Sequence, residues 1–386
     1  MAAKTPWTVA AALAVIYLVS NLPTPLYVVY QERFGFSQLM LTLVYSAYVA
    51  GTVVTMLFLG RLSDQIGRRP VLLVSLLLSG GAAALFLAAQ STAWLFPARI
   101  ASGLAIALAS GASTAWVVEL EPRGDKGRGT RIAIGANDVG LALGPLFAGV
   151  LADFAPHPLR LPYWIFLGLL VPAGLLALVT RETGEQEPLG QVSLRPRLGV
   201  PREKRRAFVA PAVGAFAAFA VLGFYSALIP TLLGKELGMK SHALAGGVVA
   251  LLFGCGTAAI AWRPSLDDRR GLRAALLWLL PGTLLLVVAE AARSLPLLLA
   301  ATVVGGLAGG LAYRSSLRAV NALVPDEQRS EVVSSYLIAC YCGVSLPVIG
   351  IGLLGQKLPP LPTNAIFAGV VCAAAVGALI VQRKAA

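Results

Sequence analysis

The sequence predicts an all-α membrane protein with twelve transmembrane helices, arranged as two pseudo-symmetric six-helix bundles. Three observations predict this fold class: the composition, the length of the apolar runs, and one polar stretch that divides the runs into two sets. The chain has 386 residues, of which 57% are hydrophobic and only 13% are charged. Soluble chains carry about 25% charged residues. This chain therefore has too little polar surface for water, and its composition suits a bilayer.

The apolar runs are each long enough for a helix that crosses the hydrocarbon core with some tilt. Six runs precede the polar stretch, at residues 7–30, 38–59, 71–89, 93–116, 130–151 and 163–179. Six runs follow it, at residues 208–233, 243–262, 272–288, 295–319, 332–354 and 364–381. The sequence therefore predicts an N-terminal bundle over residues 1–180, a cytoplasmic linker over 181–206, and a C-terminal bundle over 207–386. The linker is basic and contains several prolines, so either a short surface helix or a solvated tether suits it.

The distribution of Lys and Arg predicts the orientation. With the N-terminus in the cytoplasm, 23 basic residues fall on the cytoplasmic side and six fall on the other side. Basic loops stay inside, so both termini are expected in the cytoplasm. The net charge of +13 is thereby explained by loops between spans, and no nucleic-acid partner is expected. We expect a multi-pass protein of the bacterial inner membrane, surrounded by lipid.

Metal and enzyme chemistry find little support in the sequence. The chain has two histidines, His157 and His242, and both are predicted to lie in loops. No nucleotide-binding loop, metal cluster or Ser/His/Asp set stands out. The cysteines all fall in apolar runs, which is typical of packing residues: Cys255, Cys340, Cys342 and Cys372. We therefore expect no catalytic residues, no metal and no cofactor.

The two halves of the chain contain similar loops at matching positions. The loop after the second run contains Asp64 and Gly67, followed by arginines, and the loop after the eighth run contains Asp268 and Gly271, with Arg273 close behind. Two related six-helix halves are typical of transporters that rock around a site between the halves. The repeat therefore favours this architecture.

The loop at residues 60–70 resembles a signature of the major facilitator superfamily, G-x-x-x-D-x-x-G-R-R between helices two and three. Here it is formed by Gly60, Asp64, Gly67 and Arg68, and Glu119 is the expected partner of Arg68. Gln65 stands where the family usually has arginine. The resemblance extends over nearly the whole chain and implies the major facilitator fold. In the family, such a cluster acts as a conformational latch that holds the outward-facing state.

Two further motifs carry the resemblance. Arg99 and Gly103 are similar to the R-x-x-x-G element of helix four; because a charge inside a span is costly, Arg99 is either functional or snorkels to the membrane surface. The fifth run resembles the antiporter motif of the twelve-span drug:proton antiporter branch, through Gly140, Gly144, Pro145 and Gly149. Small residues at this spacing allow close helix packing, and the proline bends the helix. The motif implies export by exchange for protons.

Asp138 and Arg314 are charged residues predicted at similar depth in the two halves, and with Arg99 they are candidates for proton coupling or gating. Three alternatives remain open for this pair. The two side chains form a gate between the halves, or they serve proton coupling and anion binding separately, or each pairs within its own half.

The candidate substrate-binding residues are polar or aromatic groups inside the spans: Asn21, Tyr48, Asn137, Tyr225, Arg314 and Tyr341. Asn21 is either a substrate contact or a residue that fills the gap left by Pro23 and Pro25, which cannot donate backbone hydrogen bonds. The tyrosines offer hydrogen-bonding aromatic walls, although packing is the common role of tyrosine in spans.

The resemblance implies proton-coupled export of small amphipathic or anionic molecules, such as drugs, metabolites or metal chelators, by alternating access. The energy source would be the proton gradient, the partners would be the substrate and protons, and the protein is expected to be a monomer. An uptake symporter for a sugar or an organic acid is the alternative. A membrane receptor that transports nothing is a more remote one.

Overall fold

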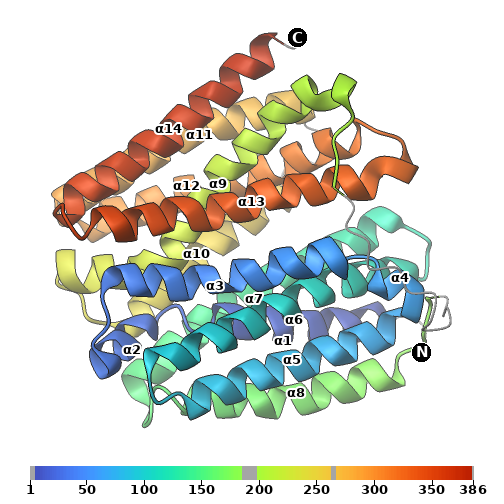
Figure 1. Ribbon diagram of the computed structural model, residues 1–386, viewed down its shortest axis with the longest axis horizontal. Coiled ribbons are helices and arrows are strands. Elements are labelled where there is room, and N and C mark those ends of the chain that lie inside the picture. The colour runs from blue at the N-terminus through green and yellow to red at the C-terminus, as the bar shows by residue number, and fades with distance from the viewer. Residues whose placement is uncertain (1–4, 185–197, 262–266, 385–386) are drawn as a thin grey trace. The chain divides into compact units, whose positions relative to one another are not determined.

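The computed structural model describes residues 5–184, 198–261 and 267–384 of the chain (Figure 1). Within these residues, eleven helices are long and apolar enough to cross a membrane, and a shorter apolar helix, Pro6–Asn21, precedes them. Large apolar side chains lie on the surface of these helices, among them Leu77, Trp164 and Val179. An outward-facing apolar surface of this kind is suited to lipid. The predicted all-α membrane fold is confirmed.

The first predicted span, at residues 7–30, is interrupted in the structure. Helix α1 (Thr5–Asn21) ends before Pro23, and α2 (Tyr27–Phe34) begins after Pro25. The five residues between them form turns, because a proline has no N–H to donate and each one disrupts the helix. The expectation that residues 7–30 form a single helix is therefore wrong. Helix α2 is followed by Gly35, whose φ of 68° lies in the left-handed region.

The chain folds as two compact units. Unit 1 comprises Met1–Phe36, Ala47–Pro196 and His242–Gly246. Its helices after α2 are α3 (Gln38–Phe58) from Ala47 onward, α4 (Leu62–Ile66), α5 (Arg68–Ala88), α6 (Thr92–Glu119), α7 (Lys126–Phe154) and α8 (Leu161–Val179). Helix α1 is central in this unit and packs against α6, α7 and α8, while α5 packs against α6 and α8 (Figure 1).

Unit 2 comprises Ser37–Ser46, Arg197–Ser241 and Gly247–Ala386. Its helices are η3 (Arg202–Lys204), α9 (Arg205–Thr231), η4 (Leu232–Glu236), α10 (His242–Ala261) from Gly247 onward, α11 (Asp268–Ala291), α12 (Leu295–Asn321), α13 (Asp326–Leu354) and α14 (Pro360–Lys384). Helix α9 packs against α12, α13 and α14, and α11 packs against α12 and α14. The same pairing order therefore occurs in both units, as expected for a repeat.

The predicted spans and helices agree closely elsewhere, although most helices extend a few residues beyond the apolar runs. Helices α7 and α11 are capped by Asp125 and Asp267, whose carboxylates accept hydrogen bonds from Arg128 N and Arg270 N. Much of the predicted linker, at 185–197, and part of the second repeat loop, at 262–266, lie outside the described residues. The proposed boundaries at 180 and 206 stay a prediction.

Candidate functional site

Arg68 lies at the centre of a charged cluster where α4 meets α5 in unit 1. Its Nη2 donates to Glu119 Oε1 at 2.8 Å, and its Nη1 donates to Ser63 Oγ at 3.0 Å and to Asp64 Oδ1. The three groups come from α4 and from the end of α6. Because a guanidinium has five donors in one plane, a single side chain binds both carboxylates. We call Asp64, Arg68, Glu119 and Glu182 the Arg68 cluster.

Gly67 makes the sharp connection between α4 and α5. Its φ of 98° and ψ of 160° belong to a backbone conformation that only glycine adopts readily. Helix α4 therefore ends and α5 begins at this one residue. The approach is also close, since a Cβ on Gly184 would lie 3.0 Å from the Cα of Gly67. Gly60, the other predicted glycine, lies in the turn before α4.

Glu182 is the member of the cluster that sequence reasoning missed. Its Oε1 accepts from Arg68 N, Thr183 N and Gly184 N, each at 2.9 Å, and its Oε2 accepts from Arg69 N at 2.8 Å. Burial disfavours its charged form, but these four N–H donors outweigh that effect and lower the pKa of the carboxyl. Glu182 therefore caps the N-terminus of α5, which has no cap of its own.

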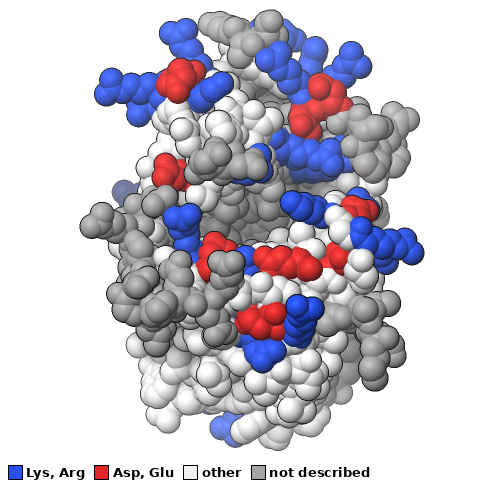
Figure 2. Space-filling view, turned by 90° about the vertical axis from the view of Figure 1, so that its right-hand side faces the viewer, with Lys and Arg blue, Asp and Glu red and all other residues white. Residues whose placement is uncertain are grey.

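Acidic and basic side chains gather on the face of the molecule that carries α4 (Figure 2). The loop between α6 and α7 adds Glu121, which is buried and accepts from Arg123 N and Asp125 N at 2.7 and 2.9 Å. Its other oxygen pairs with Arg128 at 2.9 Å. Both Glu121 and Glu182 thus organise loops through backbone N–H groups.

Arg99 is buried inside unit 1, so the snorkelling alternative is wrong. The residue is only 2% exposed, and its Nη1 donates to Ser20 O of α1 at 2.7 Å. Its guanidinium carbon lies 4.6 Å from the centre of the Tyr48 ring of α3, which is cation–π geometry. One turn along α6, Gly103 touches the backbone of Tyr48 and permits this close approach. The structure therefore brings Arg99 and Tyr48 together.

Asn21 lies at the break after α1 and fills the gap there. Its Nδ2 donates to Leu141 O of α7 at 3.0 Å, and its Oδ1 accepts from Thr24 Oγ1 at 3.1 Å. Both ends of the amide thus bind protein groups. Of the two alternatives for Asn21, this geometry favours the structural one.

The glycines of the predicted antiporter motif lie at the closest helix contacts of unit 1. A Cβ on Gly140 would meet Ala14 O and the Tyr17 side chain, and a Cβ on Gly144 would meet Leu18 O, all on α1. Pro145, next to Gly144, is buried. Glycine is therefore required where α7 crosses α1.

The end of α7 meets the first turn of α10, whose residues His242–Gly246 belong to unit 1. Gly149 touches the backbone of His242, and Pro145 that of Gly246. Asp153 Oδ1 accepts from His242 N and lies 2.8 Å from His242 Nδ1, and Oδ2 accepts from Ala243 N. His242 was expected in a loop; it instead begins α10, which Asp153 caps.

Asp138 and Arg314 have partners within their own units. Asp138 is half-buried on α7 and interacts electrostatically with Tyr17 of α1. Arg314 is 7% exposed; its Nη1 donates to Ile260 O of α10 at 3.1 Å, and its charge interacts with Asp268. This geometry suits the alternative of pairing within each half, and the gate between them stays a prediction.

Sequence profiles of known families match most of the chain. The one described as Major Facilitator Superfamily matches residues 9–289, and one described as PUCC protein matches residues 235–345. This chain belongs to the Major Facilitator Superfamily.

Curated relatives include proteins named for drug resistance. The chain is 34% identical over 145 residues to the tetracycline resistance protein, class H, of Pasteurella multocida, which covers 37% of this chain and 35% of the relative. It is 30% identical over 189 residues to the multidrug resistance protein MdtL of Shewanella sp. (strain ANA-3), covering 47% and 46%. The chain thus matches between about a third and half of the length of these relatives.

Solved structures show the same fold. A crystal structure of a peptide transporter, POT, superposes with a TM-score of 0.76 over 99% of this chain and 93% of that one, at 15% identity. At this identity the likeness establishes the fold of the superfamily and nothing about substrate.

The remaining candidate substrate residues of this superfamily member are dispersed. Asn137 is half-buried on α7, beside Asp138. Tyr225 of α9 is 1% exposed and its hydroxyl accepts from Thr302 Oγ1 at 3.2 Å, which is the environment of a packing residue. Tyr341 is half-buried on α13 in unit 2. Of the predicted substrate residues, Tyr48 contacts another functional candidate, Arg99.

Proposed function

We propose that this protein exports small amphipathic or anionic molecules in exchange for protons, by alternating access. The observation that carries the proposal is the packing of α7 on α1. Gly140 and Gly144 of the antiporter motif lie directly on the backbone of α1. Relatives named for tetracycline and multidrug resistance support the direction of transport.

Arg99 is the proposed contact for an anionic group of the substrate. It is held by Ser20 O and by the Tyr48 ring, so its position is fixed before a substrate arrives. Burying a guanidinium in a membrane costs free energy, and the binding of an anion offsets this cost.

Asp138 is the proposed proton carrier. It lies half-buried on α7, between the glycine motif and the cytoplasmic start of that helix, next to Tyr17 of α1. A proton on this carboxylate would alter its interaction with Tyr17 at the same α1–α7 crossing that the motif packs.

The proposed setting is the bacterial inner membrane, with both termini in the cytoplasm and the protein as a monomer. The basic and acidic groups on the α4 face support this orientation, because charged loops rich in Lys and Arg stay inside (Figure 2). The Arg68 cluster then lies on the cytoplasmic side, where the proposed latch would act.

Transport by inside-out vesicles tests the proposal. Vesicles with an acidic lumen should accumulate a fluorescent efflux dye or tetracycline, and collapse of the gradient should release it. Asp138→Asn should abolish this gradient-driven accumulation while leaving dye binding to the purified protein intact. Asp125→Asn, which alters a carboxylate at the start of the same helix, is the matched control and should transport normally.

Two outcomes would contradict the proposal. Accumulation that proceeds only with the opposite gradient would indicate uptake. Normal, pH-dependent transport by Asp138→Asn would remove Asp138 from proton coupling but leave the direction of transport unaffected.

A further inference from the structure

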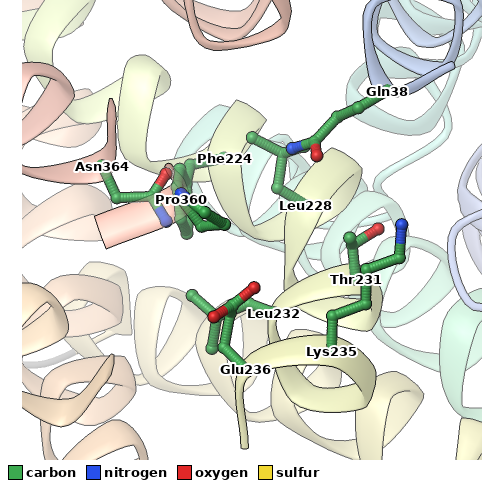
Figure 3. Close-up of a pocket in the computed structure, with 9 residues that line it drawn as sticks. All are labelled: Gln38, Phe224, Leu228, Thr231, Leu232, Lys235, Glu236, Pro360 and Asn364. Carbon is green, nitrogen blue, oxygen red and sulfur yellow. The ribbon is translucent and has the colours of Figure 1, made fainter. Parts of the chain in front are cut away.

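A small cavity lies inside unit 2, where α9 passes into η4 and meets the start of α14. Its volume is about 40 Å³, room for a few waters or one small ion. The lining has an apolar side, formed by Phe224, Leu228, Leu232 and Pro360, and a polar side, formed by Gln38, Thr231, Lys235, Glu236 and Asn364. Figure 3 shows that these side chains come from different segments and surround one space.

Two buried polar groups lack a hydrogen-bond partner among the described residues: one lines this cavity, and the other is bonded to a residue that lines it. Thr231 lines the cavity and is 7% exposed, and its Oγ1 has no partner in the described structure. Glu290 lies behind Asn364, whose Nδ2 donates to Glu290 Oε2 at 2.8 Å. Glu290 is 4% exposed, and its Oε1 has no partner among the described residues. Buried polar groups are normally paired, so these two oxygens indicate that something else belongs here.

The backbone is also unusual at this position. After Pro230, the chain leaves the α-helical pattern and winds as a π-helix over Leu232–Glu236, with Leu237 N donating to Leu232 O at 3.1 Å. Such wide turns are rare and occur frequently at functional sites. Here the wide turn places both Lys235 and Glu236 on the lining of the cavity (Figure 3).

The charges around the cavity sum to a negative value. The groups are the carboxylates of Glu236 and Glu290, which interact electrostatically, and the ammonium of Lys235. Glu290 is buried and Glu236 is half-buried, whereas Lys235 is exposed to solvent. One positive charge is therefore missing beside the buried carboxylate, and leaving a buried charge unbalanced is costly.

We propose that this cavity is a binding site for a small monovalent cation, such as Na⁺. The available ligands are hydroxyl, carboxylate and amide oxygens, which hard cations prefer. A single positive charge would neutralise the site, whereas a divalent ion would leave it with a net positive charge. The cavity is too small to hold an organic cation. The site belongs to unit 2 alone, so the inference is independent of the proposed direction of transport and of Asp138.

Binding of radiolabelled sodium to the purified full-length protein tests the site. The assay is run at constant ionic strength with choline as the replacement cation, and lithium and potassium serve as competitors. Saturable sodium binding is expected in the wild type, together with a rise in melting temperature as sodium replaces choline. Thr231→Val, which keeps the shape but removes the oxygen, should weaken binding by about tenfold or more.

Two further variants keep the test decisive. Glu290→Gln preserves the side-chain shape and removes the buried charge, so it should also abolish the sodium-dependent rise in melting temperature. Thr283→Val removes a buried hydroxyl from α11 that bonds Leu279 O at 2.7 Å, and as the matched control it should bind sodium normally. Absence of saturable binding of sodium, lithium and potassium to the wild type would overturn the proposal. Equal binding by wild type, Thr231→Val and Glu290→Gln would do the same.

Discussion

At the scale of single residues, the carboxylates of this protein work largely through backbone N–H groups. Glu182, Glu121 and Asp153 each accept from at least two backbone nitrogens. A carboxylate held by several N–H donors is fixed in place, and a helix N-terminus favours its charge. Glu182 lies in the segment after α8 and binds the backbone at the start of α5. It therefore connects that segment to the Arg68 cluster.

The lowered pKa of Glu182 predicts how stability depends on pH. The contribution of the ionised Glu182 to folding stability is complete above the ordinary glutamate pKa of about 4.3. It is lost as the pH falls through the lower pKa that this carboxyl has in the folded state. Glu182→Gln should therefore destabilise the protein by about 1 kcal/mol at neutral pH. The difference from wild type should shrink below about pH 4.

Thermal unfolding in detergent at several pH values measures this effect. Glu32→Gln changes an exposed carboxylate and should leave the melting temperature unchanged. A difference between Glu182→Gln and wild type that stays constant down to about pH 3 would contradict the role of the ionised carboxylate.

At the scale of helices, α7 is positioned by glycines whose neighbours leave no room for a methyl group. Gly140 and Gly144 face the backbone of α1, whereas a methyl group added at Gly135 on the same helix would have nothing within 4 Å. Gly140→Ala and Gly144→Ala should therefore force the helices apart, at a cost of about 1–3 kcal/mol, and reduce transport. Gly135→Ala should be neutral or slightly stabilising, because alanine favours helix by about 1 kcal/mol.

Melting temperature and transport rate in vesicles check both directions of this comparison. If all three alanine variants behave alike, close packing on α1 is not what these glycines provide. A loss of transport with unchanged melting temperature would instead place their role in the conformational change.

The helices could be predicted from the sequence because a bilayer demands long apolar runs. The interruption after Asn21 was missed because two prolines are compatible with either a bend or a break, and the outcome depends on partners such as Leu141 O. The pairing of Arg68 with Glu119 was accessible through the family motif. The role of Glu182 was not, because its partners at the start of α5 lie 113 and 114 residues away and no local pattern marks them.

At the scale of the whole molecule, the topology depends on whether the interrupted first segment crosses the membrane. Helix α1 has 17 residues and spans about 25 Å, short of a hydrocarbon core of about 30 Å. Helix α2 adds eight residues after the break, enough to complete a crossing. With such a crossing and the eleven long helices of the described residues, the chain would cross twelve times and both termini would lie on one side. Without a crossing by α1 and α2, the termini would lie on opposite sides.

Reporter fusions distinguish these two topologies. Green fluorescent protein should fluoresce at either terminus, since it folds in the cytoplasm, and alkaline phosphatase inserted at Gly35 should be active on the outer side. Insertion at Gly124, in the basic loop between α6 and α7, is the control and should give an inactive phosphatase. If the two termini report opposite sides, or if phosphatase at Gly35 is inactive, the first segment does not cross the membrane. The break at Pro23 and Pro25 would then mark a re-entrant segment, and Arg99, bonded to Ser20 O, would lie beside it.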